Sequence, residues 1–502
     1  MTKYINILTF LAFLSSGIIS ESNITDRIRK DLVLRNDLSS KINKNRSEEE
    51  LVEFIQTIVN AYSIPGLSIA VVKNQSIVWE EYFGYANISD EILVDENTMF
   101  ILSSISKTIT ATALMQLFQD DLFELEDDID NYLPFNVNHP DNPFIPITFK
   151  MLLSHTSGIQ DNWGFMPYYE GDSPLELGYY LFEYLSPGGQ FYNSNLNFTN
   201  SMPGTNYSYS NIAAALIGLL VEEISNQSFN EYCKENIFYP LEMDNASWFL
   251  SGIDNLDQVA LPYKIMGGSG NSCYEIGCGI YDDSNPCFCD PACVNYNDCC
   301  FDYDAICGEN GTGNSGVELQ EQAHYGYSDY PSGQLRTTAN NLAKFVSAYL
   351  NDGTYNGISI LDEETIELIK TSHYPEVDSD QGLIWYYKNQ NGRQLFGHNG
   401  GDVGSLTEMF ISYSDNIGVV LLSNSTNYNG VIEIEKAVFD FAEEGNFIVM
   451  GDVNEDSLVN IQDIILVIES ILNNTYNNLA DLNEDSIIDI LDIVILVDII
   501  LN

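Results

Sequence analysis

A serine and a lysine three residues apart are the strongest candidates for chemistry in this chain of 502 residues. Ser104 and Lys107 form a Ser-x-x-Lys motif at the start of a predicted helix over 104–118. That spacing puts both side chains on one helical face, so the amine can reach the hydroxyl and take its proton. Free amides at a helix N-terminus can also stabilise an oxyanion. By itself the motif is weak evidence, because about one chance match is expected in a chain of this size.

Two motifs further along the chain carry more polar groups. Tyr209 and Asn211 form a Tyr-x-Asn triplet that precedes a strongly apolar helical run. Residues 397–401 read Gly-His-Asn-Gly-Gly and are predicted to form a turn just before a strand. A lone histidine in such a turn, here His398, is more often structural than catalytic. Each motif alone is common, so it is their combination that indicates an active site.

The elements that must position these residues lie at both ends of a long central region. The predicted elements are strands at 67–72, 76–79, 382–387, 407–412 and 418–423 and helices at 104–118 and 431–443. Strands at both ends with helices between them predict one α+β body, residues 46–445. The sheet of that body is expected to join distant parts of the chain.

Taken in this order, the three motifs resemble the serine β-lactamase and penicillin-binding-protein family, nearest the class C β-lactamases, D-aminopeptidases and related esterases. Two further stretches, 152–158 and 332–342, are also similar to that family. The resemblance covers about 50–445 without the cysteine-rich insert described below. It implies an α+β fold in which helices cover an antiparallel sheet.

The resemblance also implies a role for each motif residue. Ser104 attacks a carbonyl and forms an acyl-enzyme, which water then hydrolyses. Lys107 takes the Ser104 proton, and burial with neighbouring positive potential must keep it near neutral. Tyr209 relays a proton to the leaving group and activates the water, and Asn211 holds the substrate amide. The backbone amides of Ser104 and Gly401 form the oxyanion hole.

One departure from the family pattern bears on the substrate. Members that recognise penicillin usually carry Lys-Thr-Gly at the third motif, whereas this chain has His398-Asn399-Gly400. Histidine is often neutral at pH 7, so the grip on a substrate carboxylate is expected to be weaker. This favours an esterase or peptidase over an efficient β-lactamase. The alternative is a catalytically inactive adhesion or scaffold protein. His155, in the stretch 152–158, is expected to fix a structural turn.

The N-terminal residues and the composition indicate the compartment. Lys3 precedes an apolar run at 7–14 that small residues follow, which is the layout of a signal peptide over 1–20. A membrane anchor is the alternative, but the run is short for spanning a bilayer. Residues 21–45 are expected to be a leader or linker. The net charge of −54 disfavours nucleic acid and anionic membranes as partners.

Cysteines cluster in one segment, which indicates a disulfide framework in an exported chain. The eight are Cys273, Cys278, Cys287, Cys289, Cys293, Cys299, Cys300 and Cys307. With the run Cys-Cys-Phe-Asp-Tyr at 299–303, the segment 270–310 resembles a somatomedin B domain. Sequence alone permits 105 pairings; the family's connectivity implies Cys273–Cys289, Cys278–Cys307, Cys287–Cys300 and Cys293–Cys299. We expect a lid or protein-binding knob here. The ninth cysteine, Cys233, is predicted to be a core residue.

The tail, 446–502, holds an acidic repeat with a period of 29 residues and has no Lys or Arg. Oxygen ligands at loop positions 1, 3, 5, 9 and 12, with a carbonyl at position 7, form a calcium cage like that of an EF-hand. The predicted ligands are Asp452, Asn454, Asp456, Asn460 and Asp463, then Asp481, Asn483, Asp485, Asp489 and Asp492, with the carbonyls of Leu458 and Ile487. Ser457 and Ser486 stand at position 6, where glycine is usual. Two Ca²⁺ ions are therefore expected.

Each acidic loop runs into an apolar helix, at 464–472 or 493–501, and the whole tail resembles a type I dockerin. The resemblance implies docking to a cohesin-type partner through Ile461-Gln462 and Ile490-Leu491. A surface-anchoring or sorting tag is the alternative. Dockerins accompany polysaccharide-degrading enzymes, so an acetyl or feruloyl ester of a glycan is one substrate to test, on association alone.

Overall fold

The computed structural model describes residues 47–266, 318–445, 451–454, 459–473, 475–483 and 485–501. One compact unit comprises residues 51–59, 64–264 and 320–502, and a second comprises 1–50, 60–63 and 265–319. The predicted signal peptide, the leader, and the cysteine-rich insert with its implied bridges lie outside the described residues. So do Asp456, Ser457 and Leu458 of the first acidic loop.

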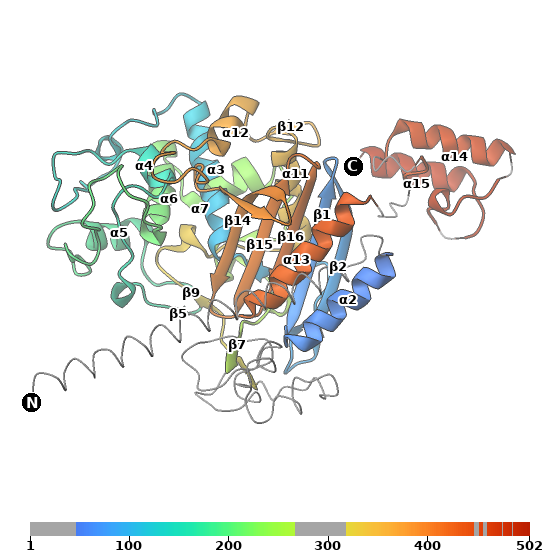
Figure 1. Ribbon diagram of the computed structural model, residues 1–502, viewed down its shortest axis with the longest axis horizontal. Helices are drawn as coiled ribbons and strands as arrows, with labels where there is room; N and C mark the ends of the chain where they lie inside the picture. Colours follow the sequence, from blue (N-terminus) through green and yellow to red (C-terminus); the bar gives the residue numbers. More distant parts are fainter. Residues whose placement is uncertain are drawn as a thin grey trace, which may run out of the picture. The chain divides into compact units, whose positions relative to one another are not determined.

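A seven-stranded antiparallel sheet forms the centre of the α+β body, in the order β13-β14-β15-β16-β1-β2-β3 (Figure 1). Its strands are β1 (Gly66–Lys73), β2 (Ser76–Asn87), β3 (Ile92–Leu93), β13 (Tyr386–Gln390), β14 (Arg393–Asp402), β15 (Ser405–Ser412) and β16 (Ile417–Ser423). β1 pairs with β16 from Leu67↔Ser423 to Lys73↔Ile417. The sheet therefore joins distant parts of the chain, as the sequence predicts, and the predicted α+β class is confirmed.

Helices cover both faces of this sheet, which explains why its central strands are almost continuously apolar. Every residue of β16 is buried, and seven of the eight in β1 are. Figure 1 shows α2 and α13 in front of the sheet. The helices are α2 (Glu48–Ala61), α3 (Ser106–Gln119), α4 (Phe149–Leu153), α5 (Leu177–Leu185), α6 (Asn211–Ser225), α7 (Phe229–Cys233), α11 (Ala339–Leu350), α12 (Glu363–Lys370), α13 (Tyr428–Glu443), α14 (Ile461–Asn473) and α15 (Ile490–Leu501).

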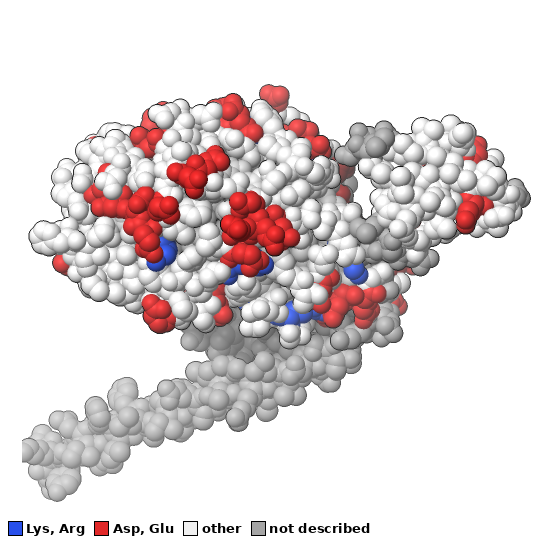
Figure 2. Space-filling view, turned by 90° about the horizontal axis from the view of Figure 1, so that it is seen from above, with Lys and Arg blue, Asp and Glu red and all other residues white. Residues whose placement is uncertain are grey.

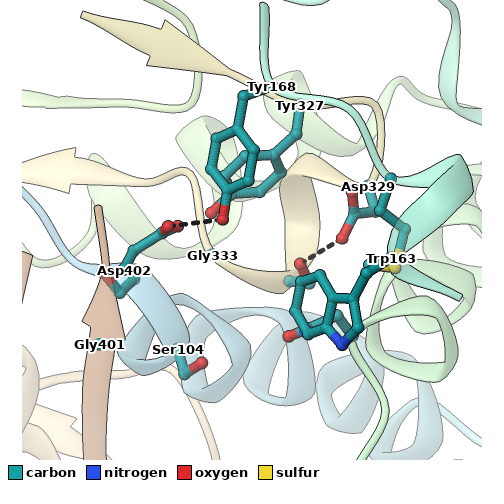
Figure 3. A pocket seen from close by; sticks show the side chains of 12 residues that line it. Ser104, Trp163, Tyr168, Tyr327, Asp329, Gly333, Gly401 and Asp402 are labelled. Atoms are coloured by element: carbon teal, nitrogen blue, oxygen red, sulfur yellow. Dashed lines mark hydrogen bonds between the residues drawn. The ribbon is translucent and has the colours of Figure 1, made fainter. Parts of the chain in front are cut away.

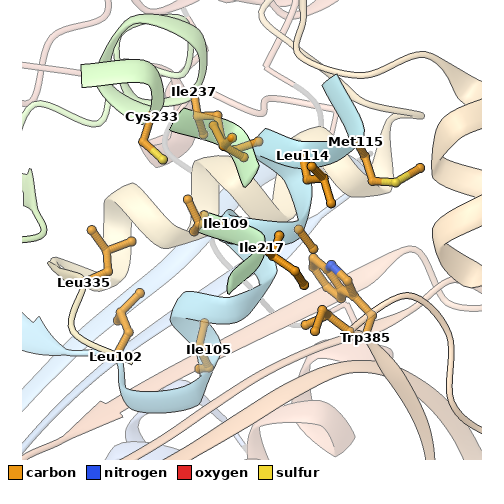
Figure 4. Close-up of a cluster of buried hydrophobic side chains, with 14 of the residues drawn as sticks. Leu102, Ile105, Ile109, Leu114, Met115, Ile217, Cys233, Ile237, Leu335 and Trp385 are labelled. Atoms are coloured by element: carbon orange, nitrogen blue, oxygen red, sulfur yellow. The ribbon is translucent and has the colours of Figure 1, made fainter. Parts of the chain in front are cut away.

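The core of the body surrounds α3, the helix that follows Ser104 (Figure 4). Eleven of its fourteen residues are buried, and it packs against the more apolar α6. Figure 4 shows Ile109 and Leu114 of α3 near Ile217 of α6. Because α3 is buried on nearly all sides, it is a rigid base for the residues at its start. Cys233 is buried in the same cluster, as predicted.

Short strands and turns complete the surroundings of the site. They are β4 (Phe100–Ile101), β5 (Tyr169–Glu170), β6 (Ala246–Ser247), β7 (Tyr263–Met266), β8 (Glu318–Glu321), β9 (Tyr325–Gly326), β10 (Arg336–Thr337), β11 (Thr354–Tyr355), β12 (Ile358–Ser359), η1 (Ser103–Ile105) and η7 (Tyr330–Ser332). β5 pairs with β9, which places Tyr168 and Tyr327 next to the same two-stranded ribbon. β10 lies between β4 and β6.

The predicted strand at 382–387 is wrong over most of its length. The strand begins at Tyr386, and the residues before it form a turn in which the Gly382 amide donates to the Trp385 carbonyl at 2.8 Å. Ile384 has a φ of +67°, which is rare for a β-branched residue and incompatible with a regular strand. The apolar run there is buried by the core and not by strand pairing.

The predicted glycine turn at 397–401 is also wrong, because these residues lie inside β14. Gly397 pairs with Tyr386 on one side and Phe410 on the other. A Cβ on Gly397 would lie 2.0 Å from the Met409 carbonyl oxygen, so the glycine permits close approach of two backbones. Glycines here serve strand packing and not a change of chain direction.

The tail has a small core of its own. Val467 of α14, Ala480 and Leu496 of α15 are buried together, and other aliphatic side chains pack around them. Both helices begin three residues earlier than predicted, at Ile461 and Ile490. Within the described ranges, no helix combines the length and the apolar character needed to cross a bilayer. Figure 2 shows acidic side chains spread over one face of the molecule, with few basic ones among them.

Candidate active site

Ser104 stands in a short, fixed turn just ahead of α3. The residue before it, Ser103, has a φ of +50°. Hydroxyls of β15 hold this turn: Ser405 Oγ donates to the Ile101 carbonyl at 2.9 Å, and Thr407 Oγ1 donates to the Leu102 carbonyl at 2.8 Å. Because the turn is anchored to the sheet and α3 to the core, the Ser104 hydroxyl has a defined position.

Lys107 lies one turn into α3 and is completely buried. Its Nζ donates to Ser104 Oγ at 3.0 Å and to the Ser332 carbonyl at 2.6 Å. Burial lowers the pKa of Lys107 to about 7, although nearby carboxylates raise it. Burial alone therefore lowers the pKa of Lys107 to the near-neutral value that we expected from the sequence. We also expected a positive potential around the amine, but the charged groups that act on it are carboxylates, so the potential there is negative. About half of these amines are free to accept a proton at pH 7.

Tyr209 meets the same serine from the other side. Its side chain is 36% exposed, but its hydroxyl end is buried and hydrogen-bonds Ser104. Lys107 Nζ lies 5.0 Å from the centroid of the Tyr209 ring, and the His155 ring packs on it with centroids 4.5 Å apart. Burial raises the pKa of Tyr209 above its usual value, so the phenol keeps its proton at neutral pH. It can therefore donate to a leaving group.

Asp161, which the sequence analysis missed, fixes the Tyr-x-Asn segment at the start of α6. Its carboxylate accepts bonds from Ser210 Oγ at 3.0 Å, from the Asn211 amide at 3.0 Å and from Asn211 Nδ2 at 2.8 Å. A fourth bond comes from the Ile212 amide at 3.1 Å. A carboxylate at a helix N-terminus is stabilising, and here it also orients Asn211. No spacing rule links position 161 to this motif, which is why it was missed.

His398 is buried in β14, with its ring 6.2 Å from that of Tyr209. Burial first, and then the charge of Lys107, lowers the pKa of His398 to about 3. The imidazole is therefore neutral at pH 7 and offers no positive charge to a substrate carboxylate. His155 is also buried, and its Nδ1 accepts from the Ser210 amide at 3.4 Å. It has a φ of +55° in its turn.

Two cavities open at Ser104, and both are also lined by Gly401. The larger, of about 530 Å³, is lined by Tyr207, Tyr209, Asp378, Asp380, Gln381, Tyr386, Tyr387, His398 and Asn399. The smaller, of about 70 Å³, is lined by Ser103, Trp163, Met166, Tyr168, Asn211, Tyr327, Asp329, Ser332, Gly333 and Asp402 (Figure 3). The structure thus brings the six predicted catalytic residues together. Five of them line these cavities, namely Ser104, Tyr209, Asn211, His398 and Gly401. The sixth, Lys107, forms a hydrogen bond with Ser104.

Comparisons with known proteins identify the family of the chain. The family model described as Beta-lactamase matches residues 51–440. The chain belongs to the beta-lactamase family. Protein flp of Staphylococcus aureus (strain MRSA252) is 26% identical over 228 residues, which is 45% of this chain and 43% of flp, so the match spans less than half of that relative. Penicillin-binding protein 4* of Bacillus subtilis (strain 168) is 22% identical over 80% of this chain and 76% of its own length.

Solved structures show the same fold for this beta-lactamase-family chain. The penicillin-binding protein homologue from Pyrococcus abyssi matches 84% of this chain and 81% of its own with a TM-score of 0.55 and 21% identity. The D-amino acid amidase from Ochrobactrum anthropi SV3 matches 78% of this chain and 99% of its own, also with a TM-score of 0.55, at 19% identity. At these identities the likeness extends to the fold.

In each acidic loop of the tail, one carboxylate accepts hydrogen bonds from three backbone amides. Asp463, at position 12 of the first loop, accepts from the amides of Val453 at 2.8 Å, Asn454 at 3.2 Å and Asn460 at 2.8 Å. In the second loop Asp492 makes the same three bonds, with the amides of Leu482, Asn483 and Asp489. Within the described residues, no three Asp, Glu, His or Cys side chains converge on a common metal position. The repeated geometry shows that both copies fold alike.

Proposed function

We propose that this chain is a serine hydrolase that forms an acyl-enzyme on Ser104 and cleaves ester or amide bonds. One observation carries the proposal: the Lys107 amine lies 3.0 Å from Ser104 Oγ in a site that lowers its pKa to about 7. A lysine with its ordinary pKa would be a poor base at neutral pH, whereas this one is close to the optimum for general-base catalysis.

The geometry gives each group a step in the reaction. Lys107 takes the proton of Ser104 as Oγ attacks the substrate carbonyl. The amides of Ser104 and Gly401 stabilise the oxyanion. Tyr209, which is protonated at neutral pH, donates its proton to the leaving group and recovers it through Lys107. Water, activated by the same two groups, then hydrolyses the acyl-enzyme.

The substrate class we propose is an ester, an amide or a D-amino-acid peptide in preference to a β-lactam. Neutral His398 stands where penicillin-recognising relatives carry a lysine, so a substrate carboxylate gains little there. The fold likeness to a D-amino acid amidase, and to a Beta-Lactamase/D-Alanine Carboxypeptidase from Pseudomonas syringae with a TM-score of 0.54 and 17% identity, is compatible with amide chemistry.

A fluorophosphonate probe tests the enzyme proposal directly. The wild-type chain should be labelled on Ser104, as mapped by peptide mass spectrometry, and Ser104→Ala should not be labelled. Ser251→Ala is the control, because it removes an exposed serine outside both cavities and should leave the label on Ser104. Absence of label from the folded wild type would favour the inactive adhesion or scaffold protein. A panel of p-nitrophenyl esters, nitrocefin and D-amino-acid amides would then rank the substrates.

We also propose that the chain is secreted. Its segment 270–310, which interrupts the sequence of the α+β body, is proposed to be a somatomedin B-like module held by disulfide bridges. The support is the clustering of eight cysteines after a signal-like N-terminus. Four bridges would leave Cys233 as the one thiol of the denatured, unreduced chain. Titration of that chain with a thiol reagent should therefore find one thiol, and a count of nine would reject the bridges.

The tail, in this proposal, binds two Ca²⁺ ions and docks to a cohesin-type partner. Asp452, Asp463, Asp481 and Asp492 are buried in a segment that has no basic residue, so a cation would relieve their repulsion. Ser486, at the position where glycine is usual, has the left-handed φ of +67° that such a loop requires. Carboxylate and side-chain amide oxygens are the ligand types that Ca²⁺ takes, and in this proposal binding turns Asp463 and Asp492 from the backbone amides towards the ion.

Calorimetric titration of the chelator-treated full chain with Ca²⁺ tests this part. We expect about two sites, one fewer for Asp452→Ala and one fewer for Asp481→Ala. Glu469→Ala, on α14 outside both loops, is the control and should retain both sites. Ca²⁺ should also protect the tail from proteolysis. A tail that resists protease equally with and without chelator would contradict the calcium proposal.

A further inference from the structure

The smaller cavity lies on the acyl side of Ser104. A leaving group that takes its proton from Tyr209 must lie beside that residue, and Tyr209 lines the larger cavity. Ser104 and Gly401 line both cavities, so a carbonyl bound at Ser104 directs its leaving group into the larger one and its acyl group into the smaller one. At about 70 Å³, the smaller cavity accommodates a short acyl group.

Two carboxylates lie in the wall of this acyl cavity. Among the described residues that line it, Asp329 and Asp402 are the charged ones. Asp329 is 3% exposed and accepts from Ser332 Oγ at 2.9 Å, and Asp402 accepts from the Tyr168 hydroxyl at 2.7 Å. Figure 3 shows the two carboxylates on either side of the Tyr168 and Tyr327 rings, with Ser104 below them.

Among the described residues, no cation is hydrogen-bonded to either of these two carboxylates. The Lys107 amine donates to Ser104 and to a carbonyl, and the Arg336 guanidinium donates to the carbonyl oxygens of Gln334 and Tyr325. The charge of Lys107 acts on both carboxylates from a distance, but its own pKa of about 7 leaves it only partly charged at neutral pH. Burial raises the pKa of Asp329 to about 6 and raises that of Asp402 as well. The cavity therefore has an excess of negative charge that a ligand ammonium group would balance.

We propose that Asp329 and Asp402 bind a protonated amine on the acyl part of the substrate. The enzyme therefore prefers aminoacyl esters and amides that have a free ammonium group over neutral or N-acylated ones. Trp163, 64% exposed at the same cavity, offers an aromatic face to the cation. A neutral or anionic acyl group would leave both carboxylates unpaired and, if anionic, would be repelled. This inference rests on the proposed acyl-enzyme chemistry at Ser104.

A pair of substrates that differ at the amine tests the inference. Alanine p-nitroanilide and its N-acetyl derivative, each as both enantiomers, are compared by kcat/KM in the wild type, Asp329→Asn, Asp402→Asn and Asp380→Asn. We expect the free amine to be preferred at least about tenfold for one enantiomer, and each cavity variant to lower that ratio by about tenfold. Asp380→Asn is the matched control: it removes a carboxylate from the larger cavity and should change the ratio less than about twofold.

Inhibition supplies a second measurement that needs no variant. Ethylammonium should inhibit the wild-type hydrolysis of p-nitrophenyl acetate competitively, and ethanol at the same concentration should not. Equal kcat/KM for the two anilides, or no difference between the two inhibitors, would overturn the inference while acetate hydrolysis still upheld the proposed hydrolase. Failure to hydrolyse p-nitrophenyl acetate and to form an acyl-enzyme would instead overturn the proposed function. An equal loss of the ratio in Asp380→Asn would show that general charge, and not this cavity, selects the substrate.

Discussion

Gly400→Ala should damage the active site without touching any group that reacts. A Cβ at this position would lie 2.4 Å from the Leu102 carbonyl oxygen, 2.3 Å from Thr407 Oγ1 and 3.0 Å from Ser103 Cβ. Ordinary contacts between such atoms are about 3.5 Å. The side chain of Thr407 cannot simply turn away, because its hydroxyl holds the Leu102 carbonyl at 2.8 Å. β14 and the turn before Ser104 must therefore separate by about 1 Å.

The expected loss of activity follows from that displacement. A shift of about 1 Å between a nucleophile and its oxyanion donors costs about 100-fold in rate. The cost in stability is smaller, about 1–3 kcal/mol, as for other overpacked sites. Ser104 lies on one side of the displaced contact and Gly401 on the other, so acylation should suffer much more than the melting temperature does.

The assay is the pre-steady-state burst of p-nitrophenol from p-nitrophenyl acetate, measured beside thermal unfolding. Gly178→Ala, in α5 and outside both cavities, is the control, because its Cβ would meet Leu219 Cδ1 at an ordinary 3.4 Å. We expect a far smaller loss there than the 100-fold of Gly400→Ala. Equal losses in the two variants, or a normal burst from a folded Gly400→Ala, would refute the role of this contact.

Three further changes have defined outcomes. The kcat/KM for p-nitrophenyl acetate should rise with pH through a pKa near 7, because Lys107 must lose its proton to act as the base, and Lys107→Arg should abolish that rise with the activity. Asp161→Ala removes four hydrogen bonds at the start of α6 and should cost about 2 kcal/mol in stability and about tenfold in kcat/KM, as checked by denaturant titration and kinetics. Lys388→Met leaves buried Glu408 and Glu435 without their cation and should cost about 3–5 kcal/mol. Burial and the charge of Glu435 raise the pKa of Glu408, and the loss of Lys388 raises it further, so the melting temperature of that variant should increase as the pH falls and Glu408 takes up a proton.

The catalytic core was predictable from sequence because its chemistry depends on local spacing. Ser104 and Lys107 are one helical turn apart, so the helix alone brings them together. The acidic loops repeat every 29 residues, and among their described residues Asp463 and Asp492 accept matching hydrogen bonds. Strands β1, β2, β15 and β16 were predictable from their apolar runs, whereas β14 was missed because its glycines resemble a turn.

The acyl cavity was not predictable, because its walls come from segments without a shared pattern. Its residues Trp163 and Tyr168, Asp329, and Asp402 come from three segments far apart in sequence, which meet through the short β5–β9 ribbon and the end of β14. Asp161 was missed for the same reason. The turn at Ile384 illustrates a second limit, since apolar residues in a buried loop have the same composition as a strand.

The charges around Lys107 and its burial have opposite effects on its pKa, and this balance links substrate binding to catalysis. His155 and His398 are neutral, so the negative charges dominate. Burial lowers the pKa of Lys107, while Asp161, Asp329 and Asp402 raise it. Two of these three carboxylates are the ones that we expect to hold a substrate ammonium group.

An ammonium group bound by Asp329 and Asp402 would cancel part of the field that favours protonated Lys107. The pKa of Lys107 should then be lower in the substrate complex than in the free enzyme. Because kcat reports the complex and kcat/KM the free enzyme, kcat for the aminoacyl anilide should rise at a lower pH than kcat/KM does. For p-nitrophenyl acetate, which has no amine, the two rises should coincide. Coincidence for both substrates would mean that the carboxylates bind the amine, if at all, without tuning the base. Separation confined to the aminoacyl substrate would mean that binding the correct substrate also prepares the base that attacks it.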